Sequence, residues 1–160
     1  MSDGDSLRIV RLASTDAETM SRMLDLFRDV FEDDANYGQS RPSAAYLQRL
    51  LASDTFIAIA AVEGSRVLGG LAAYELRKFE QERSEIYIYD LAVSSEHRRR
   101  GVATAMIRAL QRLASERHAY VIFVQADHGD DPAIALYSKL GIREDVLHFD
   151  LQVARAAVEE

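Results

Sequence analysis

The amino-acid sequence predicts an α/β protein in which antiparallel strands come first and a strand–helix–strand unit follows. Three apolar segments rich in β-branched and aromatic residues lie between 55 and 93, separated only by short polar turns, as is typical of antiparallel sheets. From 101 onward, segments with helical spacing alternate with strands, which favours a βαβ arrangement. The expected sheet is mixed and mostly antiparallel, with helices flanking it.

Each expected element has a local signal, either apolar residues at a period of 3.6 or 2, or a capping residue. Asp16 and Ser43 are expected to begin helices, and Asp131 with Pro132 is expected to begin another that Gly141 ends. Residues 32–42 break the helical pattern. In chain order we expect a strand over 7–12, helices over 16–31 and 44–52, strands over 55–63, 67–76 and 84–93, a helix over 101–117, a buried strand over 119–126, a helix over 133–140 and a strand over 144–153.

Composition limits the classes of partner. The 160 residues carry a formal net charge of -7 and no cysteine, so nucleic acid and anionic membranes are disfavoured and a cationic partner is compatible. No signal peptide or membrane-spanning segment is recognised, and we expect a cytoplasmic protein. We expect one domain over residues 1–152 and a frayed tail over 153–160.

A basic segment, "HRRRGVAT", contrasts with this acidity. It lies between the strand that ends at Val93 and an amphipathic helix, and positive side chains at a helix N-terminus are unfavourable unless an anion joins them. This segment suits a diphosphate in three ways. The helix N-terminus has unpaired backbone N–H groups, the small residues Gly101 and Ala103 let an anion come close to the backbone, and the arginines can donate to phosphate oxygens. The alternative is a solvated turn in which Glu96 pairs with an arginine.

Two motifs carry a resemblance to a known family. "LAVSSEHRRRGVAT" resembles the acetyl-coenzyme A signature of the GNAT superfamily of N-acetyltransferases, which is Gln or Arg, two variable residues, Gly, one variable residue, then Gly or Ala. "DDPAIALYSKLGI" resembles the later GNAT motif, in which a helix carries a tyrosine soon followed by a glycine. The resemblance spans 7–151, and "TFIAIAA", "SEIYIYDLAV" and residues 120–150 are similar to aminoglycoside 3-N-acetyltransferases of the gentamicin-resistance type.

This resemblance implies transfer of an acetyl group from acetyl-CoA to a primary amine, most closely the 3-amino group of an aminoglycoside. It implies Asp90 as the base that takes a proton from the amine and Tyr137 as the acid that protonates the leaving sulfur. A backbone N–H near Val93 would polarise the acetyl carbonyl. The residues that the resemblance assigns to the cofactor are Leu91, Ala92, Val93, Arg98, Arg99, Arg100, Gly101, Val102, Ala103 and Thr104.

An aminoglycoside is a polycation, so its binding is expected to rest on carboxylates. Asp131 serves either this purpose or as a helix cap, and Tyr87 and Tyr89 line either the pocket or the core. The four histidines lack paired metal-ligand spacing, and no metal site is expected. The carboxylates that we assign to the acceptor are Glu32, Asp33, Asp34, Glu85, Asp127 and Asp130.

Two other functions remain open at this point. The same chemistry with a different acceptor would acetylate a polyamine, a small metabolite amine or a protein amine. A non-catalytic module could instead use the arginines to bind coenzyme A or nucleic acid. The resemblance also implies a homodimer, because GNAT proteins often dimerise.

Overall fold

The computed structural model describes residues 6–155. The chain forms two compact units, Met1–Gln125 and Ala126–Glu160. The expectation of a single domain over 1–152 stays a prediction. Of the expected tail, 156–160 lie outside the described residues.

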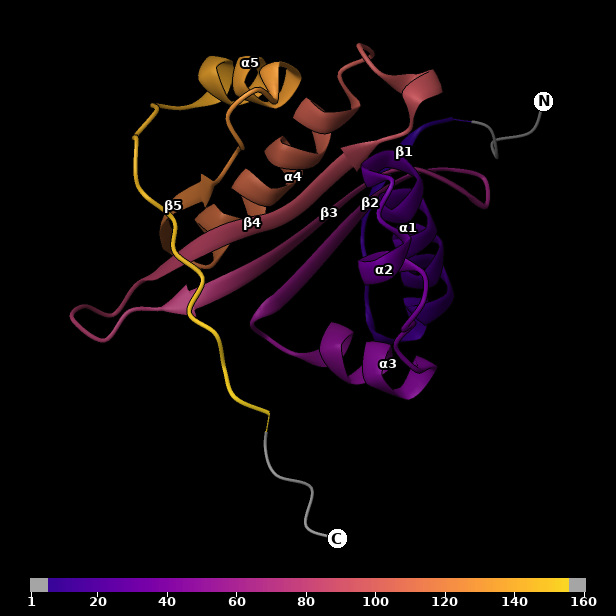
Figure 1. Ribbon diagram of the computed structural model, residues 1–160, viewed down its shortest axis with the longest axis horizontal. Helices are drawn as coiled ribbons and strands as arrows, with labels where there is room; N and C mark the ends of the chain where they lie inside the picture. The colour runs from indigo at the N-terminus through magenta and orange to yellow at the C-terminus, as the bar shows by residue number, and fades with distance from the viewer. Residues whose placement is uncertain (1–5, 156–160) are drawn as a thin grey trace, which may run out of the picture. The chain divides into compact units, whose positions relative to one another are not determined.

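The first unit contains a five-stranded sheet with the strand order β1-β2-β3-β4-β5 (Figure 1). Neighbours from β1 to β4 pair antiparallel, and β5 pairs with β4 in parallel. This confirms the mixed, mostly antiparallel sheet. The strands are β1 (Arg8–Arg11), β2 (Phe56–Glu63), β3 (Arg66–Arg77), β4 (Ser84–Val93) and β5 (Ala119–Val124).

Two neighbouring glycines in β3 show that helices cover both faces of this sheet. A Cβ built on Gly70 would lie 2.6 Å from Met23 Cγ of α1, whereas one built on Gly69 would lie 3.0 Å from Met106 Cε of α4. Successive strand residues point to opposite faces, so α1 and α4 lie on opposite sides. The helices of the first unit are α1 (Ala17–Phe31), α2 (Asp34–Tyr37), α3 (Ala44–Ala52) and α4 (Val102–Glu116).

The apolar core follows from this arrangement. On the α1 face, buried residues of α1, α3 and the sheet form one cluster that includes Met23, Phe27 and Leu47. On the α4 face, Met106 and Leu110 are fully buried. The sheet therefore has no polar face in its centre, and any polar group placed there must find a partner.

Helix starts were predicted with mixed success. Ser43 caps α3 as expected, by accepting a hydrogen bond from the Tyr46 N–H. Asp16 stands at the N-cap position of α1, but its carboxylate accepts instead from the Ala13 N–H at 2.8 Å. In the second unit, the cap of α5 (Asp131–Leu140) is Asp130 and not Asp131. That one-residue error has a simple cause, since either aspartate can cap a helix with proline near its start.

The expected break over 32–42 also contains structure that its composition conceals. Residues 34–37 form α2, a single short helix that Asp33 caps by accepting from the Asn36 N–H at 3.1 Å. Gly38 follows at the C-terminal end of this helix. A segment of four helical residues is too short to show a period, so only the cap could have indicated it.

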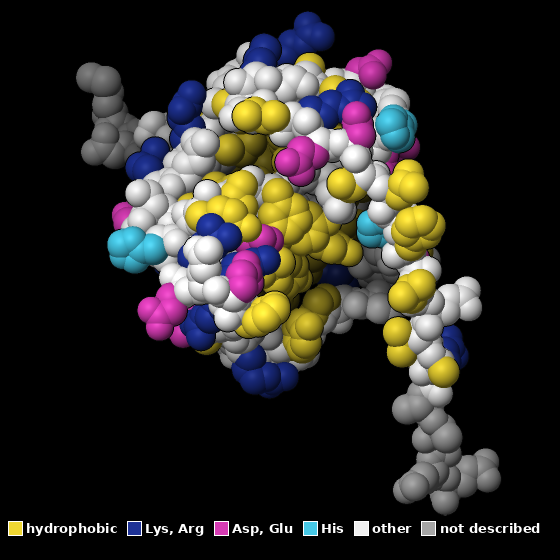
Figure 2. All heavy atoms as spheres, turned by 90° about the vertical axis from the view of Figure 1, so that its left-hand side faces the viewer, with side chains coloured by type: hydrophobic (Ala, Val, Ile, Leu, Met, Phe, Trp, Pro, Cys, Tyr) yellow, Lys and Arg dark blue, Asp and Glu magenta, His cyan; other side chains and the backbone are white. Residues whose placement is uncertain are grey.

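The strand expected over 144–153 is wrong, because residues 142–155 of the second unit adopt no regular secondary structure. The alternating apolar residues of this segment are instead highly exposed (Figure 2). Alternation shows what a segment could bury, but a strand also needs a partner for its backbone groups. The exposed side chains are Val146, Leu147, Phe149, Leu151 and Val153.

The strand β5 forms where it was expected but is not buried. Tyr120 is 48% exposed and Val121 is 40% exposed. In the first unit β5 is an edge strand, so only one of its sides is covered by a neighbouring strand. Among residues 6–155, no helix is both long and apolar enough to span a membrane.

Candidate functional site

Asp90 owes its position to an irregularity in β4. In the pairing of β3 with β4, Ala72 lies opposite Asp90 and the next residue, Ala73, lies opposite Ile88, so Tyr89 is an extra residue in the ladder. Such a bulge reverses which face the following side chains occupy. Without it, Asp90 would share the α4 face with Ile88. With it, Asp90 shares the α1 face with Ala72.

On this face the Asp90 carboxylate meets the hydroxyl of Tyr37. Tyr37 Oη donates to Asp90 Oδ1 at 2.9 Å, across 53 positions of the chain. Partial burial raises the pKa of Asp90 above its ordinary value, and the hydrogen bond from Tyr37 opposes that rise. Burial and the neighbouring Asp90 charge also raise the pKa of Tyr37, so its hydroxyl keeps its proton.

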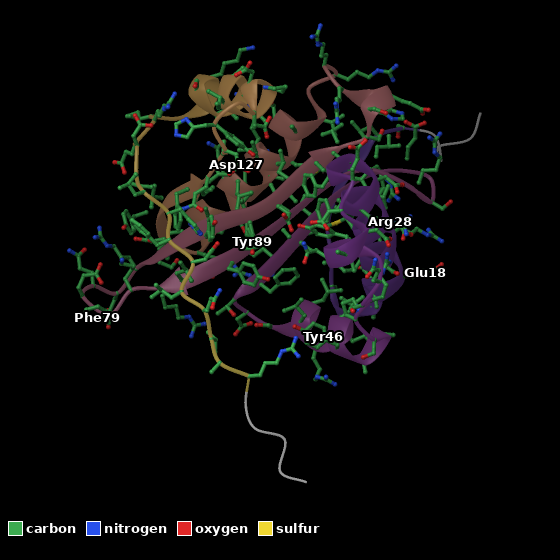
Figure 3. All side chains as sticks on the ribbon, in the orientation of Figure 1. Glu18, Arg28, Tyr46, Phe79, Tyr89 and Asp127 are labelled. Carbon is green, nitrogen blue, oxygen red and sulfur yellow. The ribbon has the colours of Figure 1, made fainter. Side chains whose placement is uncertain are left out.

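Tyrosine rings surround this carboxylate on the sheet. Tyr74 of β3 and Tyr87 of β4 both pack edge-on against Tyr89, at centroid distances of 6.0 and 5.8 Å. Tyr87 also stacks on Phe123 at 4.7 Å. Tyr89, seen on β4 in Figure 3, is 62% exposed. Of the two interpretations left open, pocket or core, this exposure excludes the core for Tyr89, and Tyr87 is half-buried.

Beyond Asp90, the end of β4 leaves backbone groups facing away from β3. The Ser94 N–H donates to Leu68 O at 2.8 Å, so the alternation of an antiparallel ladder turns the N–H of Val93 away from β3. On that side β5 pairs with β4 only as far as Ile88. The end of β4 over Leu91–Val93 is thus separated from β5, and its backbone can bind a ligand.

The loop after β4 leads directly to the N-terminus of α4. Gly101 has φ of 75° at the N-cap position, and a Cβ built there would meet nothing within 4 Å. Arg99 also has positive φ, at 64°. The first N–H groups of α4 have no helical acceptor, and the first turn carries no acidic side chain. This terminus therefore combines unpaired donors with open space.

The side chains around this loop divide into two groups. Arg98, Arg99 and Arg100 are exposed, and Arg98 Nε donates to Val93 O at 3.5 Å. Val102 is only 4% exposed, so it can contribute to a ligand site through its backbone alone. Ala92 is likewise buried. Glu96, the alternative partner of the arginines, lies 3.8 Å from Arg66 instead.

Three of the carboxylates assigned to the acceptor lie next to Tyr37. Glu32 ends α1 in the left-handed conformation and is exposed, as is Asp34. Asp33 accepts hydrogen bonds from both the backbone and the side chain of Asn36, which lower its pKa. These three carboxylates, called here the acidic start of α2, lie close to the Tyr37–Asp90 pair, where they can attract a cation.

Glu85 is placed differently. Lys78 Nζ lies 3.0 Å from its carboxylate, and Tyr120 Oη donates to it at 2.6 Å. Five positions along β4 separate it from Asp90, which corresponds to roughly 15 Å. This separation keeps Glu85 away from the acidic start of α2. Its charge is also already paired with that of Lys78.

The second unit carries the other expected site residues. Asp127 is exposed, and Asp130 caps α5 by accepting from the Ala133 N–H at 3.3 Å. Tyr137 lies on α5, and burial, with a smaller contribution from Asp130, raises its pKa to about 12. A hydroxyl with this pKa is protonated at neutral pH and can act as a donor. Within residues 6–155, no group of histidine and acidic side chains is arranged to hold a metal ion.

Comparison with known proteins identifies the family. The profile described as the acetyltransferase (GNAT) family matches residues 20–142. The chain belongs to this family. Acetyl-CoA is the acetyl donor of GNAT acetyltransferases.

Solved GNAT structures include close relatives. An aminoglycoside acetyltransferase from an uncultured soil metagenomic sample is 58% identical, with a TM-score of 0.91 over 93% of this chain and 99% of that one. A second aminoglycoside acetyltransferase, also from an uncultured soil metagenomic sample and solved with sisomicin, is 33% identical, with a TM-score of 0.86 over 92% and 97% of the two chains. N-acetyltransferase family 8 member 2 of Rattus norvegicus is 26% identical over 98 residues, which are 61% of this chain and 43% of that protein. The chain thus matches less than half the length of that curated relative.

The residues at the start of α4 fit the diphosphate of acetyl-CoA. The missing side chain at Gly101 leaves its surroundings open, and the adjacent N–H groups and exposed arginines can donate to phosphate oxygens. Acetyl-CoA itself supplies the acetyl group as a reactive thioester. For such a ligand the chain would offer the N–H groups at the start of α4 and the backbone edge at the end of β4.

Sequence reasoning missed Tyr37, which lies in the segment interpreted as a break. Its contact with Asp90 depends on α2 and on the bulge at Tyr89, and neither has a periodic signal. It also missed Arg41, which fixes α2 against α1 by donating to Asp25 Oδ1 at 2.7 Å and to Ser21. The one available signal was a tyrosine within a strongly acidic loop.

Proposed function

We propose that this GNAT protein transfers an acetyl group from acetyl-CoA to the 3-amino group of an aminoglycoside. The observation that carries the aminoglycoside class is the 58% identity, over nearly the whole chain, with an aminoglycoside acetyltransferase. The 3-amino position rests on the resemblance of the sequence to aminoglycoside 3-N-acetyltransferases. The sisomicin complex of the second relative supports the same class of acceptor. The overall charge of -7 is compatible with a polycationic substrate.

Asp90 acts as the general base. An aminoglycoside amine is mostly protonated at neutral pH, so it must lose a proton before its nitrogen can bond to the acetyl carbon. A carboxylate whose pKa is raised by burial is a better proton acceptor than an ordinary aspartate. Asp90 accepts this proton directly or through a water molecule.

Tyr137 acts as the general acid. Departure of the sulfur breaks the carbon–sulfur bond and leaves negative charge on that atom, which a hydroxyl proton neutralises. The raised pKa keeps the Tyr137 hydroxyl protonated until that step. In the same reaction, the backbone N–H of Val93 donates to the carbonyl oxygen as its negative charge develops.

The acidic start of α2 binds the ammonium groups of the acceptor. Glu32 and Asp34 are exposed, and Asp33 is ionised and held by Asn36. Asp127 and Asp130 are also proposed to bind ammonium groups of the acceptor, and both are exposed. Glu85 contributes least, because Lys78 already neutralises it.

The test is acetylation of a panel of amines by the purified protein. Sisomicin and gentamicin are expected to be acetylated faster than spermidine or a peptide with a free N-terminus. The position of the new amide is read by NMR of the sisomicin product, and acetylation at the 6′-amine would overturn the 3-amino assignment while keeping the substrate class. Preference for spermidine or the peptide would overturn the class itself.

We also propose that the active protein is a cytoplasmic homodimer; the dimer rests on the frequent dimerisation of GNAT proteins. Light scattering during gel filtration measures the oligomeric state, and a monomeric mass at the assay concentration would contradict a dimer. Fractionation of the native host tests the compartment.

A further inference from the structure

The inference concerns how the Asp90 carboxylate is held, and it rests on the proposed role of Asp90 as general base. Asp90 Oδ1 accepts the hydrogen bond from Tyr37. Within residues 6–155, no protein donor is bonded to Asp90 Oδ2. One oxygen is therefore fixed, and the other is available to take a proton.

Tyr37 is itself held from two directions. Its ring packs against Phe27 and Phe31 of α1, at centroid distances of 5.9 and 5.6 Å. Its backbone carbonyl accepts from Arg41 Nη1 at 3.3 Å, and the same nitrogen donates to Asp25 of α1. The ring and the backbone of Tyr37 are thus both tied to α1, so the position of its hydroxyl is set before any substrate binds.

The hydrogen bond from Tyr37 is the contact that favours the ionised form of Asp90 against the effect of burial. The titratable groups that face the pair are Tyr37 and Asp33 from α2 and its start, Tyr74 from β3, and Tyr87 and Tyr89 from β4. The raised pKa values of Tyr37, Tyr74 and Tyr87 keep these hydroxyls neutral at assay pH, and the lowered pKa of Asp33 keeps it negative. Burial raises the pKa of Asp90, and the Tyr37 hydroxyl is the group that lowers it.

We propose that Tyr37 is a positioning residue that orients the Asp90 carboxylate and keeps it ionised for general base catalysis. In the transfer step, the ammonium group of the acceptor loses a proton to Asp90 Oδ2, and its freed lone pair forms the new nitrogen–carbon bond. The carbon–sulfur bond of the thioester breaks, the leaving sulfur takes the proton of Tyr137, and the second proton of the nitrogen returns to Tyr137 directly or through water. Tyr37 neither gains nor loses a proton. It donates the same hydrogen bond before and after the step, more strongly to the charged carboxylate.

The experiment compares pH profiles of kcat/KM for the wild-type protein, Tyr37→Phe and Tyr46→Phe. Tyr37→Phe retains the ring that packs on α1 and removes the hydroxyl, so the acidic limb of the profile is expected to move to higher pH by about one pH unit. Tyr46 lies on α3 and is 52% exposed, so Tyr46→Phe is expected to leave the limb in place. Circular dichroism checks that each variant is folded.

A second substitution is expected to shift the acidic limb of the kcat/KM profile in the opposite direction. Replacing Tyr37 with 3-fluorotyrosine makes the hydroxyl a stronger donor at nearly the same size, so the acidic limb is expected to move to lower pH. A carbon-13 NMR titration of the Asp90 carboxyl measures the same shifts without turnover. An Asp90 pKa that is unchanged in both Tyr37 variants would overturn the inference.

Asp90→Asn distinguishes the proposed role of Asp90 as general base from the proposed role of Tyr37 in positioning it. If it retains full activity and the acidic limb, Asp90 is not the base, and the mechanism in the proposed function is wrong. If it abolishes turnover while neither Tyr37 variant moves the limb, the proposed base stands and the role of Tyr37 is wrong. A loss of activity in Tyr37→Phe at all pH values, with no movement of the limb, would show only a structural role and would also overturn the inference.

Discussion

Gly101→Ala tests the anion site at the start of α4. Gly101 has φ of 75°, a conformation that costs an L-residue about 1 kcal/mol, so the free energy of unfolding is expected to fall by that amount. The new methyl group meets no protein atom within 4 Å, so it causes no clash. It does fill open space that a phosphate would occupy next to the backbone in the proposed cofactor site. Loss of one charge-assisted hydrogen bond costs about 2 kcal/mol, which weakens coenzyme A binding about thirtyfold.

Gly64→Ala is the matched control for this change. Gly64 has φ of 59° in the turn between β2 and β3, so alanine there carries a similar conformational cost without touching the loop before α4. Isothermal titration calorimetry measures the Kd for coenzyme A, and urea unfolding measures the stability of both variants. Both should lose similar stability, but only Gly101→Ala should lose affinity. Equal Kd values for the two variants would refute the assignment of the diphosphate to Gly101.

Three further changes test the packing and the electrostatics. Gly70→Ala places a Cβ 2.6 Å from Met23 Cγ in the core and is expected to lower the free energy of unfolding by about 1–3 kcal/mol in urea titrations; an unchanged midpoint would contradict the tight packing. Glu75→Ala removes the carboxylate that lies 2.7 Å from Arg117 Nη1, and because that pair is largely buried we expect the free energy of unfolding to fall by about 3 kcal/mol. The fall should be much smaller in an Arg117→Met, Glu75→Leu double variant, in which no charge is left unpaired. Asp90→Asn is expected to raise Tm at pH 7. A carboxyl whose pKa is raised by folding binds its proton more tightly in the folded state, so the folded protein loses stability as the pH rises from the unfolded-state pKa to the folded-state pKa. At pH 3, below both pKa values, the wild type and the variant should have the same Tm.

The secondary structure of the first unit was largely predictable, because its elements carry strong local signals. The helix after Gly101 and the strand ending at Val93 lie within one residue of their expected ends, and Ser43 caps α3 as expected. The loop between that strand and that helix was interpretable because a helix N-terminus has the same unpaired donors in every protein. The function predicted for this loop depended only on the strand before it and the helix after it, and both are recognisable from the sequence.

Errors arose where a residue's role depends on a partner elsewhere. Residues 144–153 alternate as a strand should, yet they remain without regular structure, because pairing requires a second strand at the right place. Asp130 and Asp131 compete for the same cap, and only the path of the backbone selects the first. Glu85 was expected to be free for a cation, but Lys78, on the neighbouring segment of the hairpin, already pairs with it.

The sequence by itself determined the class of sheet and the family motif before α4, since both follow from short-range spacing. It also marked Asp90 as a carboxylate within an apolar strand. Only the tertiary structure decided which face of the sheet Asp90 occupies, because the extra residue at Tyr89 reverses the alternation and is visible only in the register with β3. The same applies to Tyr37, whose hydroxyl reaches Asp90 from 53 positions away because helix packing, and no local rule, brings them together.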